Sequence, residues 1–152
     1  MALSFHYKEV KIPGLPLIRR PMIPIVFSHE GEAFETMELL DSGADFTAFT
    51  KEIADVLGLD LSGPREKALG VGGDIETIRS KVNITVSKAH EHYSFFIPVK
   101  VLLTENSSMP PLLGREGFFD EFSITFEERA KKIILKKLEK TDRRQRKIRA
   151  SP

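Results

Sequence analysis

The alternation of apolar and polar positions predicts a chain built mostly of β-strands. Residues 24–41 predict two strands joined around His29–Glu32, where a Glu-Gly pair supplies the turn. Residues 66–86 predict a strand, a glycine turn and a second strand. Residues 92–103 predict a further strand, and Pro98 should place it at an edge or a bulge because proline cannot donate to a sheet.

One segment has a clear helical pattern, from Thr50 to Gly58. Ile53, Val56 and Leu57 fall on one helical face, Thr50 can cap the first turn, and Gly58 can end the last turn. A helix this short depends on packing rather than on intrinsic propensity.

The two ends of the sequence carry weaker patterns. Residues 11–24 hold four prolines and a glycine, which predicts an extended arm. A helical turn is expected around Glu116–Glu121. Residues 124–138 predict a hairpin, but a helix competes there because Glu, Arg, Ala and Lys favour helices.

Length and composition indicate one modest domain. The chain has 152 residues, of which 41% are hydrophobic and 30% charged, and it has no cysteine. Disulfides and thiolate metal sites are therefore excluded, and no secretory or membrane-spanning segment is visible, so a cytoplasmic protein is expected. We expect an arm over 1–20, a domain over 21–137 that includes a hairpin at 123–137, and a tail over 138–152.

Charge is unevenly distributed along the chain. Residues 136–152 contain eight Lys/Arg and two acidic residues, a net of +6, whereas the other 135 residues carry 15 basic and 20 acidic residues, a net of −5. A solvated, disordered tail is the simplest interpretation. Contact with nucleic acid is the alternative, but the tail has no aromatic residue on which bases could stack.

Three short motifs occur in a fixed order: LLDSGAD at 39–45, LGVGG at 69–73 and PPLLGRE at 110–116. Each alone is an ordinary turn or strand end. Together, over residues 21–126, they resemble the retropepsin family of dimeric aspartic proteases. The resemblance implies a single-domain, mostly β acid-protease barrel with a flap hairpin and one or two short helices. It also implies an aspartic endopeptidase that needs no cofactor.

Aspartic protease chemistry requires two carboxylates that share one proton. The sequence has a single DSG motif and no internal repeat, so the pair must come from Asp41 of two copies in a homodimer. The expected partners are thus a second copy and a peptide or protein substrate, without a membrane. A catalytically inactive module that binds extended peptides on the same fold is the alternative.

The resemblance assigns further residues to the site. Ser42 would hydrogen-bond across the dimer, Gly43 would let the substrate backbone approach beside Ala44, and Asp45 would form a partly buried ion pair with Arg115. The expected flap residues are Gly70, Val71, Gly72 and Gly73. The expected substrate-binding residues are Phe46, Ala48, Pro110 and Leu112.

Other chemistries have weaker support. Asp45 as a second catalytic acid or metal ligand lacks further oxygen ligands nearby. His90 and His92 share a strand face, which permits a metal, but surface positions are commoner. A phosphate-binding loop at 69–73 lacks the Lys-Ser/Thr and helix that should follow it. We expect no metal.

Overall fold

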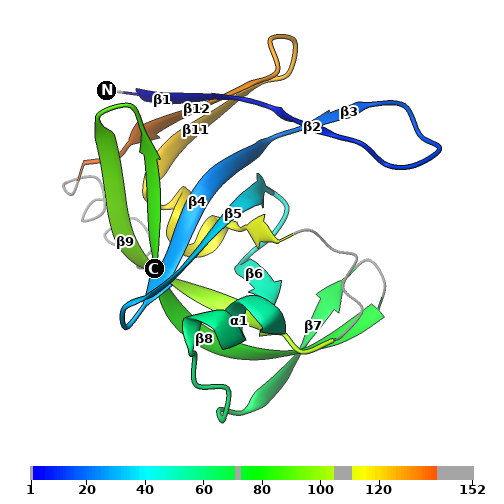
Figure 1. The fold of residues 1–152 in the computed structure, drawn as a ribbon, viewed down its shortest axis with the longest axis vertical. Coiled ribbons are helices and arrows are strands. Elements are labelled where there is room, and N and C mark those ends of the chain that lie inside the picture. The colour runs from blue at the N-terminus through cyan, green and yellow to red at the C-terminus, as the bar shows by residue number, and fades with distance from the viewer. Residues whose placement is uncertain (1, 71–72, 105–110, 140–152) are drawn as a thin grey trace, which may run out of the picture.

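The structure, a computed structural model, describes residues 2–70, 73–104 and 111–139 (Figure 1). Strands dominate it, as the sequence predicted. The elements in chain order are β1 (Ala2–His6), β2 (Lys8–Val10), β3 (Ile18–Arg20), β4 (Met22–His29), β5 (Glu32–Leu40), β6 (Thr47–Thr50), α1 (Lys51–Leu57), β7 (Arg65–Gly70), β8 (Gly73–Lys88), β9 (Glu91–Leu102), β10 (Leu112–Leu113), the distorted helical turn η1 (Arg115–Phe119), β11 (Phe122–Glu127) and β12 (Lys132–Lys137).

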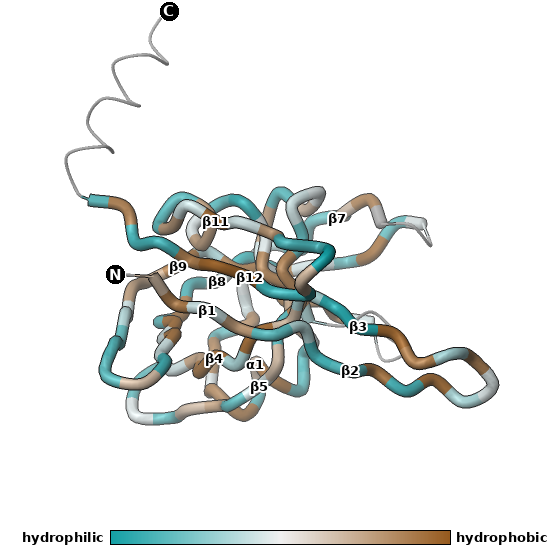
Figure 2. Tube along the Cα trace, turned by 90° about the horizontal axis from the view of Figure 1, so that it is seen from above, coloured by the Kyte–Doolittle hydropathy of each residue, from teal (hydrophilic) through white to brown (hydrophobic). Residues whose placement is uncertain are grey.

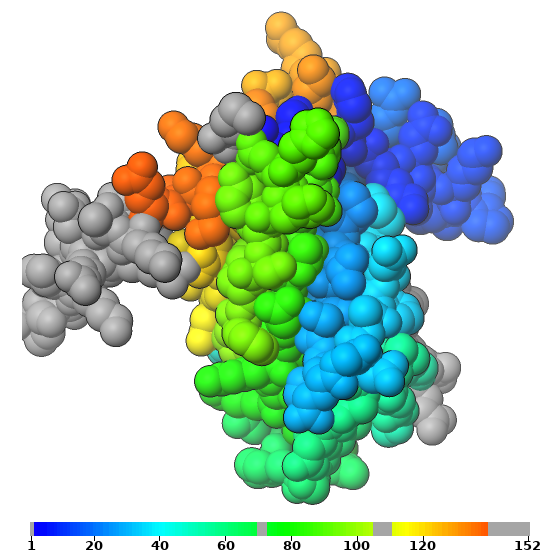
Figure 3. Space-filling model, turned by 60° about the vertical axis from the view of Figure 1, so that its left-hand side comes forward, coloured from blue at the N-terminus to red at the C-terminus, as the bar shows by residue number. Residues whose placement is uncertain are grey.

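The main sheet has the strand order β4-β5-β10-β6-β9-β8-β7, and β4 also pairs with β8. This extra pairing closes the sheet into a barrel, in which β8 and β9 lie beside β4 and β5 (Figure 3). Most neighbours are antiparallel, but β10 runs parallel to β5 and β6 runs parallel to β9. Phe27 and Phe49 meet in the core with ring centroids 4.9 Å apart.

The chain ends build a second sheet, in the order β1-β12-β11. The predicted hairpin over 124–138 is confirmed, and its helical alternative is wrong. Leu3 and Phe5 of β1 lie opposite Leu135 and Ile133 of β12, and all four side chains are buried. The hydrophobic stabilisation from burying this face outweighs the local helical preference.

The expected arm over 11–24 contains the whole of β3 and the first residues of β4. β3 pairs with β2 to form a ribbon that projects from the body together with its connecting loop, residues 11–17 (Figures 1 and 2). Leu15 and Leu17 in this loop are 57% and 49% exposed.

The predicted helix is confirmed as α1. Gly58 ends it with φ of 67°, and its N–H donates to the Asp55 carbonyl at 3.1 Å. Two details differ from the expectation. Thr50 makes no side-chain capping bond, and Val56 is 48% exposed, so Ala54 completes the buried face with Ile53 and Leu57.

Two further expectations concern Pro98 and the segment Glu116–Glu121. β9 pairs with β6 only from Val99 onward, so Pro98 lies where β9 has β8 as its one described strand partner, as predicted for an edge. The helical turn was only partly right, because Glu116 and Gly117 have non-helical backbone angles.

Within the described ranges, no helix is long and apolar enough to cross a membrane.

Candidate active site

Asp41 follows directly on β5, at the edge of the barrel core. The backbone N–H of Asp41 donates to the Leu113 carbonyl at 3.1 Å, which joins this residue to the end of β10. Its carboxylate oxygen Oδ1 accepts the Gly43 N–H at 2.9 Å. The Asp41 side chain is half-exposed. The tight turn keeps this carboxylate oriented while it remains open to a ligand.

The loop after Asp41 is held by three consecutive backbone N–H groups. Gly114 N–H donates to Thr47 Oγ1 at 3.1 Å, Arg115 N–H to the Ala44 carbonyl at 2.9 Å, and Glu116 N–H to the Asp45 carbonyl at 2.9 Å. β10 lies between β5 and β6, the two strands that flank this loop. Residues 114–116 of the third motif therefore hold in place the loop that begins in the first motif.

This attachment requires glycine at position 114. A Cβ atom built there would lie 2.2 Å from the backbone carbonyl carbon and oxygen of Phe46. Real Cβ atoms do not approach backbone so closely, so any side chain would push the two segments apart. The Leu-Leu-Gly motif thus ends in glycine because two backbones touch.

Asp45 and Arg115 form the expected ion pair, but it is not partly buried. The two side chains are 70% and 59% exposed. Arg115 is the first residue of η1, and Asp45 lies in the loop between β5 and β6. An ion pair this exposed contributes about 1 kcal/mol or less, so the backbone bonds rather than this pair hold the loop.

A cavity of about 690 Å³ adjoins Asp41. β6, β7, β8, β9 and β10 contribute to its wall. The lining residues are Asp41, Gly43, Ala44, Asp45, Phe46, Ala48, Lys67, Ala68, Leu69, Ile75, Thr77, Lys100, Leu102 and Leu112. Most of the residues assigned to catalysis or substrate binding are therefore brought together around one hollow.

Some predicted site residues are not among the lining residues. Ser42 is exposed and Arg115 lies beside Asp45. Gly70 and Gly73 pair at the end of the β7–β8 hairpin, where Gly73 has φ of 113°. Val71, Gly72 and Pro110 lie outside the described residues.

Comparison with solved structures bears on the fold. A retropepsin-like aspartic protease from Rickettsia conorii superposes with a TM-score of 0.58 at 17% identity, covering 89% of this chain and 98% of that one. The chain has the retropepsin-like fold. The EIAV protease in complex with an inhibitor also matches, with a TM-score of 0.44 at 23% identity, covering 73% of this chain and 93% of that one. No protein-family model and no curated protein sequence matches the chain.

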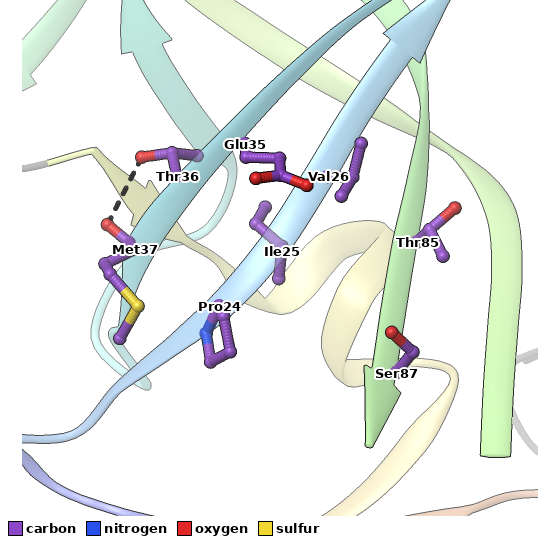
Figure 4. A pocket seen from close by; sticks show the side chains of 8 residues that line it. All are labelled: Pro24, Ile25, Val26, Glu35, Thr36, Met37, Thr85 and Ser87. Carbon is purple, nitrogen blue, oxygen red and sulfur yellow. Dashed lines mark hydrogen bonds between the residues drawn. The ribbon is translucent and has the colours of Figure 1, made fainter. Parts of the chain in front are cut away.

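The retropepsin-like barrel carries a second hollow, of about 400 Å³, over β4, β5 and β8 (Figure 4). Eight residues line it: Pro24, Ile25, Val26, Glu35, Thr36, Met37, Thr85 and Ser87. Of these only Glu35 is charged, and Asp41 is not among them. No group of three or more His, Asp or Glu residues in the described ranges could hold a metal ion.

Two charged residues near the site were missed by sequence reasoning. Lys100 lines the cavity, with its Nζ 4.0 Å from the centre of the Phe46 ring. The one sequence signal was a lysine between the apolar residues Val99 and Val101, which places it on the opposite face of β9.

Glu38 is the second missed residue, and it lies three positions before Asp41 on β5. Its side chain is fully buried opposite Ile23 of β4, and neither carboxylate oxygen has a hydrogen-bond partner in the described part of the chain. Burial raises the pKa of Glu38 to about 8, an effect that the nearby Thr36 hydroxyl opposes. Glu38 therefore stays protonated in the folded chain at neutral pH.

Gly114→Ala should destabilise the fold by at least about 2 kcal/mol, because the new methyl group overlaps the Phe46 backbone. Urea unfolding measures this. Gly63→Ala is the matched control, since its Cβ would meet only Ile78 Cγ2 at 3.8 Å. The control should stay within about 0.5 kcal/mol of wild type. Equal stability of the two variants would contradict the close contact.

Glu38 should make the fold lose stability as the pH rises. Its pKa is about 8 in the folded chain, against 4.5 for a glutamate in water, so between these values only the folded chain keeps the proton. The free energy of unfolding should fall by about 1.4 kcal/mol per pH unit over this window, relative to Glu38→Gln.

Urea unfolding from pH 5 to pH 8 measures this difference. Glu35→Gln is the control, because Glu35 is exposed on the same strand and its loss should leave the slope unchanged. If the free energy of unfolding changes with pH in the same way in wild type and Glu38→Gln, then Glu38 is either exposed to water or has hydrogen-bond partners.

Proposed function

We propose that this chain is an aspartic endopeptidase that acts as a homodimer, with Asp41 of each copy forming the catalytic pair. One carboxylate takes a proton from a bound water, which attacks the peptide carbonyl. The other carboxylate, protonated, donates a hydrogen bond to the carbonyl oxygen. No metal or cofactor takes part in this scheme.

The position of Asp41 carries the proposal. It is half-exposed and lines a cavity, with one oxygen held by the Gly43 N–H, and its loop is anchored by backbone bonds. The second carboxylate that lines the cavity, Asp45, is paired with Arg115. A second copy of Asp41 would supply the partner that the described part of one chain does not offer.

The other site residues have proposed roles around this pair. The β7–β8 hairpin would act as the flap, with Gly70 and Gly73 at its end tolerating the backbone changes that closure needs. Ser42, which is exposed, would bond to the partner copy. Ala44, Phe46, Ala48 and Leu112 would contact the substrate.

The second sheet bears on how two copies would meet. β1, β11 and β12 pair within one chain, and β1 and β11 are its two edge strands. Edge strands have unpaired backbone groups that can add another strand.

We propose that residues 21–137 form the protease domain, with β1 completing its second sheet.

Asp41→Asn should abolish peptide cleavage, because an amide can neither accept the water proton nor share one with its partner. The Asn Oδ1 can still accept the Gly43 N–H, so the fold should be kept. Cleavage of a peptide library, with circular dichroism to confirm folding, measures both effects. Asp55→Asn on the exposed face of α1 is the matched control and should cleave normally.

A folded Asp41→Asn variant that still cleaves would contradict the mechanism. Binding of peptides without cleavage by the wild type would instead favour the non-catalytic peptide-binding module.

A further inference from the structure

Two basic side chains lie close to the Phe46 ring, and one of them, Lys100, lines the Asp41 cavity. Lys100 Nζ is 4.0 Å from the ring centre, and the Arg79 guanidinium carbon is 5.7 Å from it. Lys100 of β9 lies directly opposite Arg79 of β8 and directly opposite Ala48 of β6. Residues paired in this way share a sheet face, and of these three Ala48 and Lys100 line the hollow.

The two cations differ in their counter-charges. Arg79 Nε bonds Glu66 Oε2 at 2.9 Å, which neutralises it locally. Lys100 has no carboxylate within ion-pair distance among residues 2–70, 73–104 and 111–139. It is half-buried, so its ammonium has lost part of its water. The ring face attracts the charge, but by only about 0.5–1 kcal/mol.

Neither acidic residue that lines the cavity forms an ion pair with Lys100. Asp45 is paired with Arg115, and Asp41 is held by the Gly43 N–H. Lys67 of β7 adds a second, exposed ammonium to the lining. The part of the cavity wall around Lys67 and Lys100 therefore carries positive charge that has no ion-pair partner among the described residues, although the described chain as a whole is acidic.

We propose that Lys100 and Phe46 form a subsite that binds a Glu or Asp side chain of the peptide substrate. This rests on the proposed function, because the subsite lies in the same cavity as Asp41. The substrate carboxylate would accept a hydrogen bond from Lys100 Nζ, while its methylene groups pack on the ring. Charge-assisted bonds in a partly dehydrated site are stronger than neutral ones. An acidic side chain here should raise kcat/KM about tenfold over its amide.

The test uses peptides capped at both ends, so that no terminal carboxylate competes. Within each set, the peptides differ only in having Glu, Gln or Lys at one position. Separate sets place this variable residue at each position on either side of two central apolar residues. Wild type, Lys100→Met and Lys100→Glu are compared by kcat/KM. Met keeps the length and packing of the side chain on Phe46 but removes the charge.

Lys88→Met is the matched control. Lys88, at the end of β8, has its Nζ 4.9 Å from the centre of the ring of Phe5 in β1, so it makes the same kind of contact outside the Asp41 cavity. Its loss should leave peptide preference unchanged.

The expected result is a preference for Glu over Gln at one position, reduced to about equal rates in Lys100→Met and replaced by a preference for Lys in Lys100→Glu. The preference should also shrink as salt increases. The absence of any Glu–Gln difference in wild type would overturn the subsite. So would a difference that survives in Lys100→Met.

Failure of the subsite can be separated from failure of the enzyme. Fluorescence anisotropy on the Asp41→Asn variant measures binding of the same peptides without any cleavage. If no peptide is cleaved by wild type but Glu peptides bind more tightly, the endopeptidase proposal fails and the subsite stands. Equal affinity for Glu and Gln peptides, or no binding of either, would overturn the subsite.

Discussion

The contact between the backbones of Gly114 and Phe46 is the constraint on which the rest of the site depends. It lets three successive N–H groups of residues 114–116 reach the loop after Asp41. Those bonds set the position of the loop without help from buried charges, since the Asp45–Arg115 pair is exposed. A site fixed by backbone leaves its side chains free for the ligand.

Glu38 and the proposed Asp41 pair are both carboxyl groups that hold a proton. Glu38 is buried on the strand that leads into Asp41, and its pKa of about 8 keeps it protonated at neutral pH. The proposed pair of Asp41 carboxylates also has to hold one proton. The contribution of Glu38 to stability and the proposed chemistry therefore both depend on a carboxyl group that keeps its proton.

Local patterns predicted what local physics determines. The β4–β5 turn and the end of α1 at Gly58 follow from turn residues, and the three ordered motifs predicted the retropepsin-like fold. Local patterns left the C-terminal hairpin in competition with a helix, and burial against β1 favours the hairpin. The sequence could not predict what depends on register between distant strands. Lys100 meets Phe46, 54 positions earlier, only because β6 and β9 pair, and Glu38 is buried only because β4 places Ile23 opposite it.

The central claim is that each active site needs Asp41 from two copies. It is tested most directly by mixing wild type with Asp41→Asn under conditions that exchange subunits, at constant total protein, and measuring cleavage. If both carboxylates are required, activity should follow the square of the wild-type fraction, so an equal mixture keeps about a quarter of full activity. Activity that falls in simple proportion, to about a half, would show that one chain acts alone and would contradict the account.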